Sequence, residues 1–215
     1  MSQSSYNPFS PANRKLLLGP LNVGNPITVQ VLGICSALAV TAQMKPAIVL
    51  TISVIAVMAI ANFVISLLRN TIPPRIRIIV ELVVIASLVI LVDQVLKAYV
   101  YDVSKQLSVF VGLIITNCII MGRLEAYALA NKPYPSLLDG IGNGLGYGMI
   151  LITVSFFREF FGSGSILGYK VIPEAFYEFG YRDNGFMILP PMALIIVGVI
   201  IWVQRSYTQS LVEKD

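Results

Sequence analysis

The feature that most constrains the fold is an apolar run from Ala47 to Leu68, which contains no charged residue. A helix needs about 20 apolar residues to cross the hydrocarbon core of a bilayer. We therefore expect this run to form a membrane-spanning helix. The whole chain agrees, because only 12% of its residues are charged and 56% are hydrophobic, whereas about 25% of the residues of a soluble domain are charged. The sequence predicts an integral membrane protein.

Five more apolar stretches accompany this run, and prolines or charged residues separate them. The six predicted spans cover residues 26–44, 47–68, 76–98, 107–123, 137–161 and 186–203. We expect the polar residues 1–25 to lie along the membrane surface and residues 205–215 to form a polar C-terminal tail. Between them, residues 26–204 are expected to form one six-helix membrane domain.

The six spans divide into two sets of three, at residues 26–98 and 107–204. The first span of each set is short or broken and carries one of the two cysteines, Cys35 or Cys118. Because each set has an odd number of spans, the second set enters the bilayer in the opposite orientation. This order predicts an all-α integral membrane protein with six transmembrane helices arranged as two inverted three-helix repeats. Broken helices mark the functional centre of such proteins.

Lys and Arg side chains are concentrated on the predicted side that carries both termini. Such segments stay in the cytoplasm, so we expect both termini to be cytoplasmic. The net charge of +4 suits anionic lipid headgroups, and without a basic run the sequence indicates no nucleic-acid binding. The polar N-terminal stretch lacks the apolar core of a signal peptide, so we expect no cleaved signal.

The two cysteines are candidate ligands of a metal centre. A free cysteine in an apolar span is often an inert small hydrophobe, and that interpretation stays open. A site is favoured because the chain has only two cysteines, each in an interrupted span and at equivalent places in the two repeats. Thiolates in a low-dielectric interior need a positive partner, which iron or an iron–sulfur cluster supplies. Since the chain has no histidine, two more cysteines from a second chain of the same fold are the simplest completion of a four-cysteine site.

Gly33 and Asn117 are candidate neighbours of this centre. Gly33 precedes Cys35 by two residues, and Asn117 directly precedes Cys118. An amide beside a ligating sulfur can hydrogen-bond to it and tune its potential. A hard cation such as Na⁺ needs several oxygen ligands, and the sequence does not bring such a set together.

Four strings carry a resemblance to a known family: VLGICSALAVT at 31–41, LSVFVGLIITNCIIMGR at 107–123, SLLDGIGNGLGYG at 136–148 and FFREFFGSG at 156–164. Over roughly residues 25–205 the chain resembles a family of membrane subunits. That family includes the D subunit of the bacterial Na⁺-translocating NADH:quinone oxidoreductase and the E subunit of the Rnf ferredoxin:NAD⁺ oxidoreductase. The stretch at 92–112, VDQVLKAYVYDVSKQLSVFVG, favours the NADH:quinone enzyme. The Rnf type remains the alternative.

The resemblance implies one component of a six-subunit complex in the bacterial inner membrane, paired with a homologous subunit of opposite orientation. It implies that each of the two subunits contributes two cysteines, here Cys35 and Cys118, to an intramembrane [2Fe–2S] cluster or a single iron. It also implies that the pair relays electrons across the membrane while Na⁺ is translocated. NADH, flavins and ubiquinone would then bind to other subunits, and this chain would hold no catalytic residue.

Two other classes of function stay open. A stand-alone inverted-repeat secondary transporter would place substrate-binding polar groups beside the helix breaks, where the polar residues are few. An assembly scaffold with inert thiols would tolerate the loss of both cysteines.

Glycines at every second position from Gly140 to Gly148 place three of them on one helix face. Such a face predicts close packing against another helix, either within the chain or in a partner subunit. We also expect each charged residue near a span end to find a nearby partner, including pairs four residues apart on a helix. These are Arg77 with Glu81, Asp93 with Lys97, and the adjacent Arg158 and Glu159. Asn62 and Asn117 are candidates for lining a passage.

Overall fold

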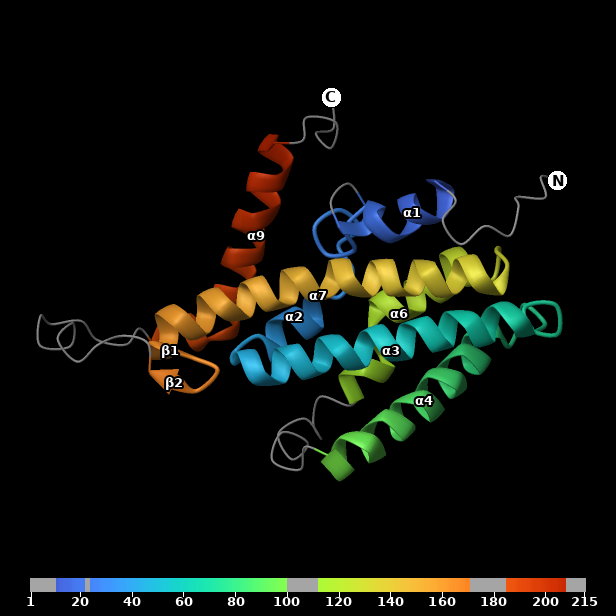
Figure 1. The fold of residues 1–215 in the computed structure, drawn as a ribbon, viewed down its shortest axis with the longest axis horizontal. Helices are drawn as coiled ribbons and strands as arrows, with labels where there is room; N and C mark the ends of the chain where they lie inside the picture. Colours follow the sequence, from blue (N-terminus) through green and yellow to red (C-terminus); the bar gives the residue numbers. More distant parts are fainter. Residues whose placement is uncertain (1–10, 22–23, 100–111, 171–184, 208–215) are drawn as a thin grey trace, which may run out of the picture.

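The computed structural model describes residues 11–21, 24–99, 112–170 and 185–207. The long helices are α3 Met44–Leu68, α4 Arg77–Tyr99, α7 Pro133–Ser163 and α9 Pro190–Tyr207 (Figure 1). The short helical elements are α1 Pro11–Leu18, the 3₁₀ turn η1 Gly19–Leu21, α2 Ile34–Val40, α6 Cys118–Arg123, the π-helix η2 Leu124–Ala128 and the 3₁₀ turn η3 Gly185–Ile188. One antiparallel hairpin, β1 Ser165–Ile166 and β2 Tyr169–Lys170, follows α7.

Four helices of the described part of the chain are long and apolar enough to cross a membrane, namely α3, α4, α7 and α9. They correspond to the second, third, fifth and sixth predicted spans. Three predicted starts were wrong, because α3 begins at Met44, α7 at Pro133 and α9 at Pro190. All three helices have prolines in their first turn: Pro46 in α3, Pro133 and Pro135 in α7, and Pro190 and Pro191 in α9. Proline is tolerated in the first turn of a helix, where its missing N–H has no partner in any case.

The predicted spans that carry the cysteines contain short helices. Within residues 26–44, only Ile34–Val40 form a complete α-helix, and Val31 and Gly33 before it have positive φ angles of 57° and 82°. In the other span, residues 107–111 lie outside the described part. Residues 112–115 are helical, the helix breaks at Thr116 and Asn117, and α6 begins at Cys118. Helical structure then continues through η2 beyond Arg123, the predicted end of the span.

The centre of the fold is the close packing of α3 against α7, which run side by side in Figure 1. A Cβ atom added to Gly140 would lie 3.0 Å from the Ala59 Cα atom, and one added to Gly144 would lie 2.8 Å from the Ile55 Cγ1 atom. The prediction of close packing on the glycine face is therefore confirmed. The neighbour is the chain's own α3, so the alternative that this face meets a partner subunit was wrong.

The next glycines along α7 face the N-terminal segment. A Cβ atom on Gly142 would lie 2.6 Å from the Leu16 carbonyl oxygen, and one on Gly146 would collide with the Pro20 carbonyl oxygen. Residues 11–21 thus pack directly against α7, although they belong to the segment predicted as a polar tail. Small residues on two adjacent faces allow α7 to contact α3 and this segment at backbone distance.

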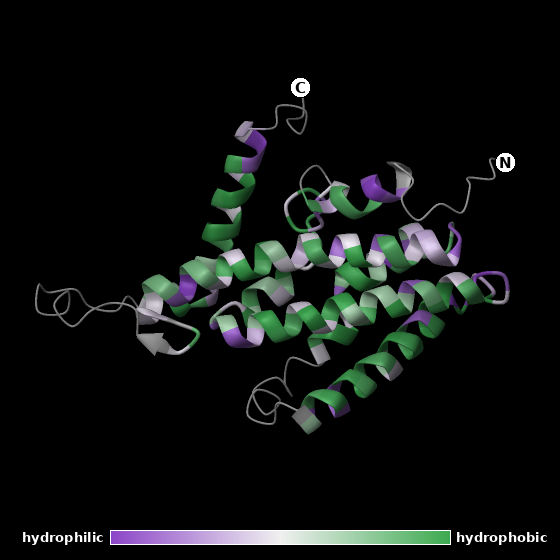
Figure 2. Ribbon diagram, viewed as in Figure 1, coloured by the Kyte–Doolittle hydropathy of each residue, from purple (hydrophilic) through white to green (hydrophobic). Residues whose placement is uncertain are grey.

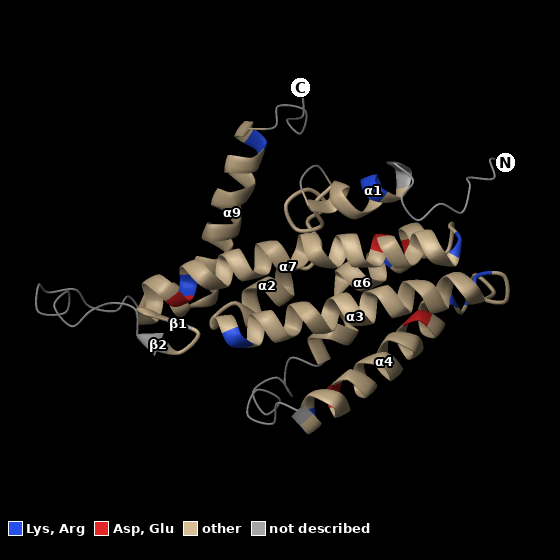
Figure 3. Cartoon of the chain, in the orientation of Figure 1, with Lys and Arg blue, Asp and Glu red and all other residues tan. Residues whose placement is uncertain are grey.

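The outer faces of the long helices are apolar and exposed (Figure 2). Trp202 on α9 is 71% exposed, and Ile79 and Leu91 on α4 are 62% and 63% exposed. Acidic and basic residues lie mainly toward the helix ends and on α1, leaving long uncharged stretches on α3 and α7 (Figure 3). Exposed apolar area on this scale is typical of surfaces covered by lipid or by another membrane chain.

Candidate functional site

The two cysteines lie side by side although 83 positions separate them in the chain. Cys35 is in the first turn of α2 and Cys118 is the first residue of α6. Their thiols are close enough to interact electrostatically, the turn at Gly33 before Cys35 touches the Cys118 sulfur, and both thiols are free. In the view of Figure 1, α2 and α6 are seen between α7 and α3, and contacts join α2 to both long helices. The fold therefore brings together the two residues that the sequence singled out.

Each cysteine follows a break that the local sequence explains. Before Cys35, Gly33 takes a left-handed conformation with φ of 82°, which glycine adopts without steric cost. Before Cys118, Asn117 caps the helix, because its Oδ1 atom accepts a hydrogen bond of 3.3 Å from the backbone N–H of Ile119. Both helices consequently begin beside the thiols.

A backbone hydrogen bond links the two breaks through sulfur. The Gly33 N–H donates to the Cys118 Sγ atom at 3.0 Å, so the turn before Cys35 contacts the second thiol directly. Hydrogen bonds to cysteine sulfurs are one of the means by which proteins set the potential of iron–sulfur sites. Gly33, predicted as a neighbour of the centre, therefore contacts a predicted ligand directly.

Asn117 lies at the centre, but its side chain does not bond to sulfur. Its amide nitrogen points to the Ser36 Oγ atom at 3.5 Å, while its oxygen serves as the helix cap. Ser36 also accepts a hydrogen bond of 2.7 Å from the hydroxyl of Tyr147, a residue that is fully buried in α7. Sequence reasoning missed Ser36 and Tyr147, because a serine and a tyrosine in apolar spans give no periodic signal.

The donor set of this centre is limited to two thiols. No group of three or more His, Cys, Asp or Glu side chains that could hold a metal occurs in the described residues. Cys35 is exposed on the surface of the chain and Cys118 is partly buried. Two adjacent thiols with one open side can bind half of a four-cysteine cluster, and a second molecule can reach them from that side.

The charged residues confirm one predicted pair and contradict the others. Lys97 and Asp93 form an ion pair of 2.6 Å on α4, as expected. Arg77 does not pair with Glu81 but with Glu125, which the π-helix η2 presents. Glu81 is 1% exposed, and its Oε1 atom has no hydrogen-bond partner. The ion pair of Arg77 with Glu125 replaces the predicted pair within α4, because Glu81 faces the interior whereas Arg77 lies at the helix end.

Arg158 and Glu159 do not pair with each other. Arg158 is 1% exposed and donates to the Ile188 carbonyl at 2.5 Å, to the Met187 carbonyl at 3.2 Å and to the Thr41 Oγ1 atom at 2.5 Å. Because it also contacts the Leu38 carbonyl at 3.4 Å, it holds the C-terminal end of α2.

Glu159 accepts hydrogen bonds from the backbone N–H groups of Met44 at 2.5 Å and Gly168 at 3.3 Å. At the Met44 N–H the carboxylate stabilises the start of α3, where the first backbone donors have no partner within the helix. At the Gly168 N–H it holds the turn between β1 and β2. The two adjacent charged residues therefore connect α7 to different elements.

A second arginine anchors α6 to α7. Arg123 donates two hydrogen bonds to the Asp139 carboxylate, of 3.0 Å and 2.5 Å, and Asn143 donates to the same carboxylate at 3.1 Å. Such bidentate pairs combine charge with fixed geometry. The end of α6 that is distant from Cys118 is thereby fixed to α7, as Arg158 fixes the distant end of α2.

Asn62 connects α3 to α7 by donating to the Ser136 carbonyl at 3.1 Å. It is fully buried, and its Oδ1 atom has no partner. In the described structure Asn62 lies in the packed seam between the two helices, so the hypothesis that it lines a passage was wrong.

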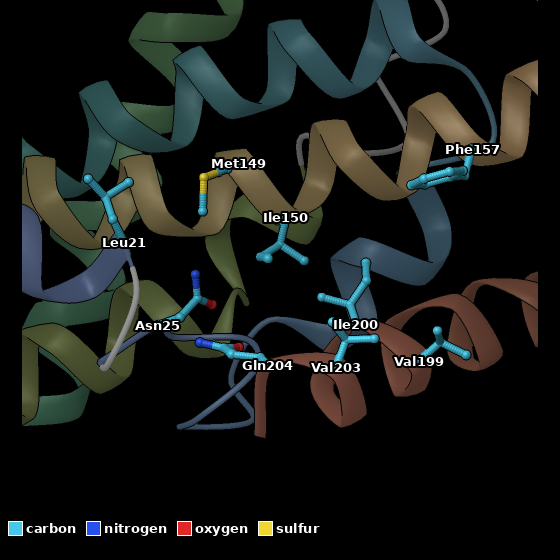
Figure 4. A pocket seen from close by; sticks show the side chains of 9 residues that line it. All are labelled: Leu21, Asn25, Met149, Ile150, Phe157, Val199, Ile200, Val203 and Gln204. Carbon is cyan, nitrogen blue, oxygen red and sulfur yellow. The ribbon is translucent and has the colours of Figure 1, made fainter. Parts of the chain in front are cut away.

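A cleft of about 440 Å³ lies between α7, α9 and the N-terminal segment (Figure 4). Its walls are mainly apolar side chains, including Ile150, Phe157 and Val203, and Asn25 and Gln204 are the polar residues that line it (Figure 4). Neither cysteine lines this cleft, so it is separate from the candidate centre.

The fold and the centre define an all-helical membrane protein with two thiols at helix breaks, and comparison with known proteins agrees. The model of the Rnf-Nqr family, described as "Rnf-Nqr subunit, membrane protein", matches residues 13–201. The chain therefore belongs to this family of membrane subunits.

Similar proteins are named as the D subunits of Na(+)-translocating NADH-quinone reductases. The one from Aeromonas hydrophila is 60% identical over 203 residues, covering 94% of this chain and 97% of the relative. That from Aeromonas salmonicida is 59% identical, with the same coverage. That from Shewanella halifaxensis is 55% identical over 200 residues, covering 93% of this chain and 95% of the relative.

Proposed function

We propose that this chain is the D subunit of a bacterial Na⁺-translocating NADH:quinone reductase. The proposal is supported by relatives of that name at 55% to 60% identity over nearly the whole chain. In this role the chain acts within a translocase complex in the inner membrane. NADH, flavins and ubiquinone bind to other subunits, and the complex couples electron transfer to Na⁺ translocation.

The observation that carries the rest of the proposal is the adjacent pair Cys35 and Cys118. We propose that these thiols hold half of a [2Fe–2S] cluster, or of a single iron, within the bilayer. The residues present fit such a group, because the donors are soft sulfurs and a backbone N–H donates to one of them, the Cys118 sulfur. When bound, the centre would supply one-electron transfer. The chain itself provides the thiolates, fixes their separation and surrounds them with apolar helices.

The other half of the ligand set belongs, in this proposal, to a homologous subunit inserted in the opposite orientation. Cys35 is exposed, so its sulfur is open to a second chain. Six spans in two inverted repeats, with both termini in the cytoplasm, would place such thiols near the midplane of the bilayer. A relay at that depth can exchange electrons with cofactors on both faces.

The test is the iron and labile-sulfide content of the purified complex. We expect Cys35→Ala and Cys118→Ala each to remove the iron centre and its EPR signal while the subunits still assemble. Thr116→Ala is the matched control, because Thr116 is exposed and lies beside the same break but carries no thiol. Iron at the wild-type level in either cysteine variant would refute the proposed ligands.

The Rnf-type ferredoxin:NAD⁺ oxidoreductase subunit is the second candidate, since the matching family model covers Rnf and Nqr subunits together. Purification of the complex and assay with NADH and quinone, against ferredoxin and NAD⁺, separates the two. A stand-alone transporter or an inert scaffold predicts instead that Cys→Ser replacement of both cysteines leaves quinone reduction intact.

A further inference from the structure

A buried tyrosine joins α7 to the turn that carries Cys35. Tyr147 has no exposed surface, and its hydroxyl donates to the Ser36 Oγ atom at 2.7 Å. A Cβ atom added to Gly33 would lie 3.0 Å from the Tyr147 ring. One side chain therefore contacts the turn on both sides of Cys35, by its ring at Gly33 and by its hydroxyl at Ser36.

The hydrogen bonds continue from this turn to the second cysteine. Ser36 donates through Oγ to the Gly33 carbonyl at 2.8 Å, and the Gly33 N–H donates to the Cys118 sulfur at 3.0 Å. Asn117, directly before Cys118, points its amide nitrogen at the same Ser36 oxygen. The hydroxyl of Ser36 thus uses its one donor and both acceptor positions. Without the Tyr147 hydroxyl, the buried Ser36 oxygen would lose the shorter of the two hydrogen bonds that it accepts.

The distant ends of the two cysteine helices are fixed to the same helix. Arg158 of α7 holds the C-terminal end of α2 through the Leu38 carbonyl, and Asp139 of α7 holds Arg123 of α6. At 1.5 Å per residue, Tyr147 lies about 12 Å along α7 from Asp139 and about 16 Å from Arg158. Tyr147 therefore contacts α2 where that helix begins, and Asn117 at the start of α6 meets the same Ser36 hydroxyl.

We propose that Tyr147 is a positioning residue that sets the separation of the two thiols and the hydrogen bonding of the Cys118 sulfur. This inference rests on the proposed function, because a shared iron centre is what requires a fixed separation. Two short helices with fixed far ends can still rotate at their near ends. The Tyr147 ring and hydroxyl restrict that rotation by holding Gly33 and Ser36 together.

The first test needs no iron. Phenylarsine oxide reacts only with closely spaced thiols, because its arsenic forms one As–S bond to each of two sulfurs while the two thiol protons and the arsenic-bound oxygen leave as water. The full-length chain, expressed in membranes without partner subunits, is expected to retain the arsenical against a competing monothiol. Tyr147→Phe should weaken this retention about fivefold, the effect of one buried hydrogen bond.

Two further variants make this test specific. Tyr134→Phe is the matched control, since Tyr134 is on the same helix about 20 Å away, and it should retain the arsenical like the wild type. Ser36→Ala should weaken retention as Tyr147→Phe does, and the double variant should be little worse than either single one. Additive losses, or a Tyr147→Phe variant that retains the arsenical normally, would overturn the proposed positioning role.

The second test uses the assembled complex. Hydrogen bonds to sulfur stabilise the reduced, more negative state of an iron–sulfur centre and so raise its potential. Tyr147→Phe should keep the iron content but shift the EPR signal and lower the midpoint potential, while Tyr134→Phe changes neither. An unchanged EPR signal and potential would overturn the positioning role. Wild-type complex without iron, together with a Tyr147 effect on the arsenical, would instead refute the proposed iron site and leave the positioning role intact.

Discussion

The close packing of α3 against α7 predicts that alanine destabilises the chain at Gly140 of α7 but not at Gly198 of α9. A Cβ atom on Gly140 would lie 3.0 Å from the Ala59 Cα atom and the Met58 carbonyl oxygen, and 3.1 Å from the Asn62 Nδ2 atom. Two of these atoms belong to backbone and cannot turn aside. Gly198 on α9 has nothing within 4 Å of the same position. Alanine should therefore disturb the first site and fit the second.

The expected magnitudes follow from three effects. Overpacking costs about 1–3 kcal/mol, and disturbing the buried bond from Asn62 to the Ser136 carbonyl costs about 1 kcal/mol more. The higher helix propensity of alanine offsets about 1 kcal/mol. We expect Gly140→Ala to lower the free energy of unfolding by about 2 kcal/mol as the sum of these effects. Gly198→Ala should leave it unchanged or raise it by up to about 1 kcal/mol.

Thermal stability of the detergent-solubilised chain measures the difference. For a chain of this size, 1 kcal/mol corresponds to about 2–4 °C in the midpoint, so Gly140→Ala should melt about 4–8 °C below the wild type. Size-exclusion chromatography after heating gives the midpoint without a substrate. If both variants melted at or above the wild-type temperature, the argument that the glycine face exists for backbone contact would be refuted.

The remaining predictions concern the charged residues and use the same melting assay. Glu81→Met should raise the free energy of unfolding by about 1 kcal/mol, because it removes a buried carboxylate oxygen without a partner. Glu159→Met should instead lower it by about 2 kcal/mol, because it leaves two backbone N–H groups unpaired. Equal effects of the two substitutions would contradict the different environments of the two carboxylates. Arg158→Lys should lower the free energy of unfolding by at least about 2 kcal/mol, because one ammonium cannot replace the guanidinium hydrogen bonds to three carbonyls and a hydroxyl. A variant as stable as the wild type would contradict the anchoring role of Arg158. Arg77→Ala should change stability by less than about 1 kcal/mol, because the pair with Glu125 is partly exposed; a larger loss would mean that the pair is not solvated.

Much of the fold was predictable because lipid imposes a simple rule. An apolar run such as 47–68 must satisfy its backbone internally and therefore forms a helix. The predicted spans at α3, α4, α7 and α9 follow from that rule. The errors at the starts of α3, α7 and α9 come from Pro46, Pro133 and Pro190, because a first turn tolerates proline. Periodicity along α7 also predicted the glycine seam, since spacing by four residues is a local property of a helix.

The candidate centre was predictable only in part. The interruptions at Gly33 and Asn117 marked Cys35 and Cys118, because residues that favour left-handed turns and caps are conspicuous in apolar runs. Tyr147 and Ser36 were missed, since their roles depend on contacts over more than a hundred positions. The error at Arg77 and Glu81 has the same origin: spacing by four predicts that two side chains can meet, not which way each one faces.

The sequence by itself determined that the chain enters a membrane, where its long helices run and where two of its apolar segments break, because these depend on local composition and on the length of a bilayer. Only the tertiary structure decided that the two helix breaks meet. There the Gly33 N–H donates a hydrogen bond to the Cys118 sulfur, and the Tyr147 ring packs against Gly33. The tertiary structure also decided that α7 anchors both cysteine helices through Asp139 and Arg158. The physical reason is that hydrogen bonds between distant segments form only after the helices have packed, and a buried polar group takes whichever partner that packing supplies.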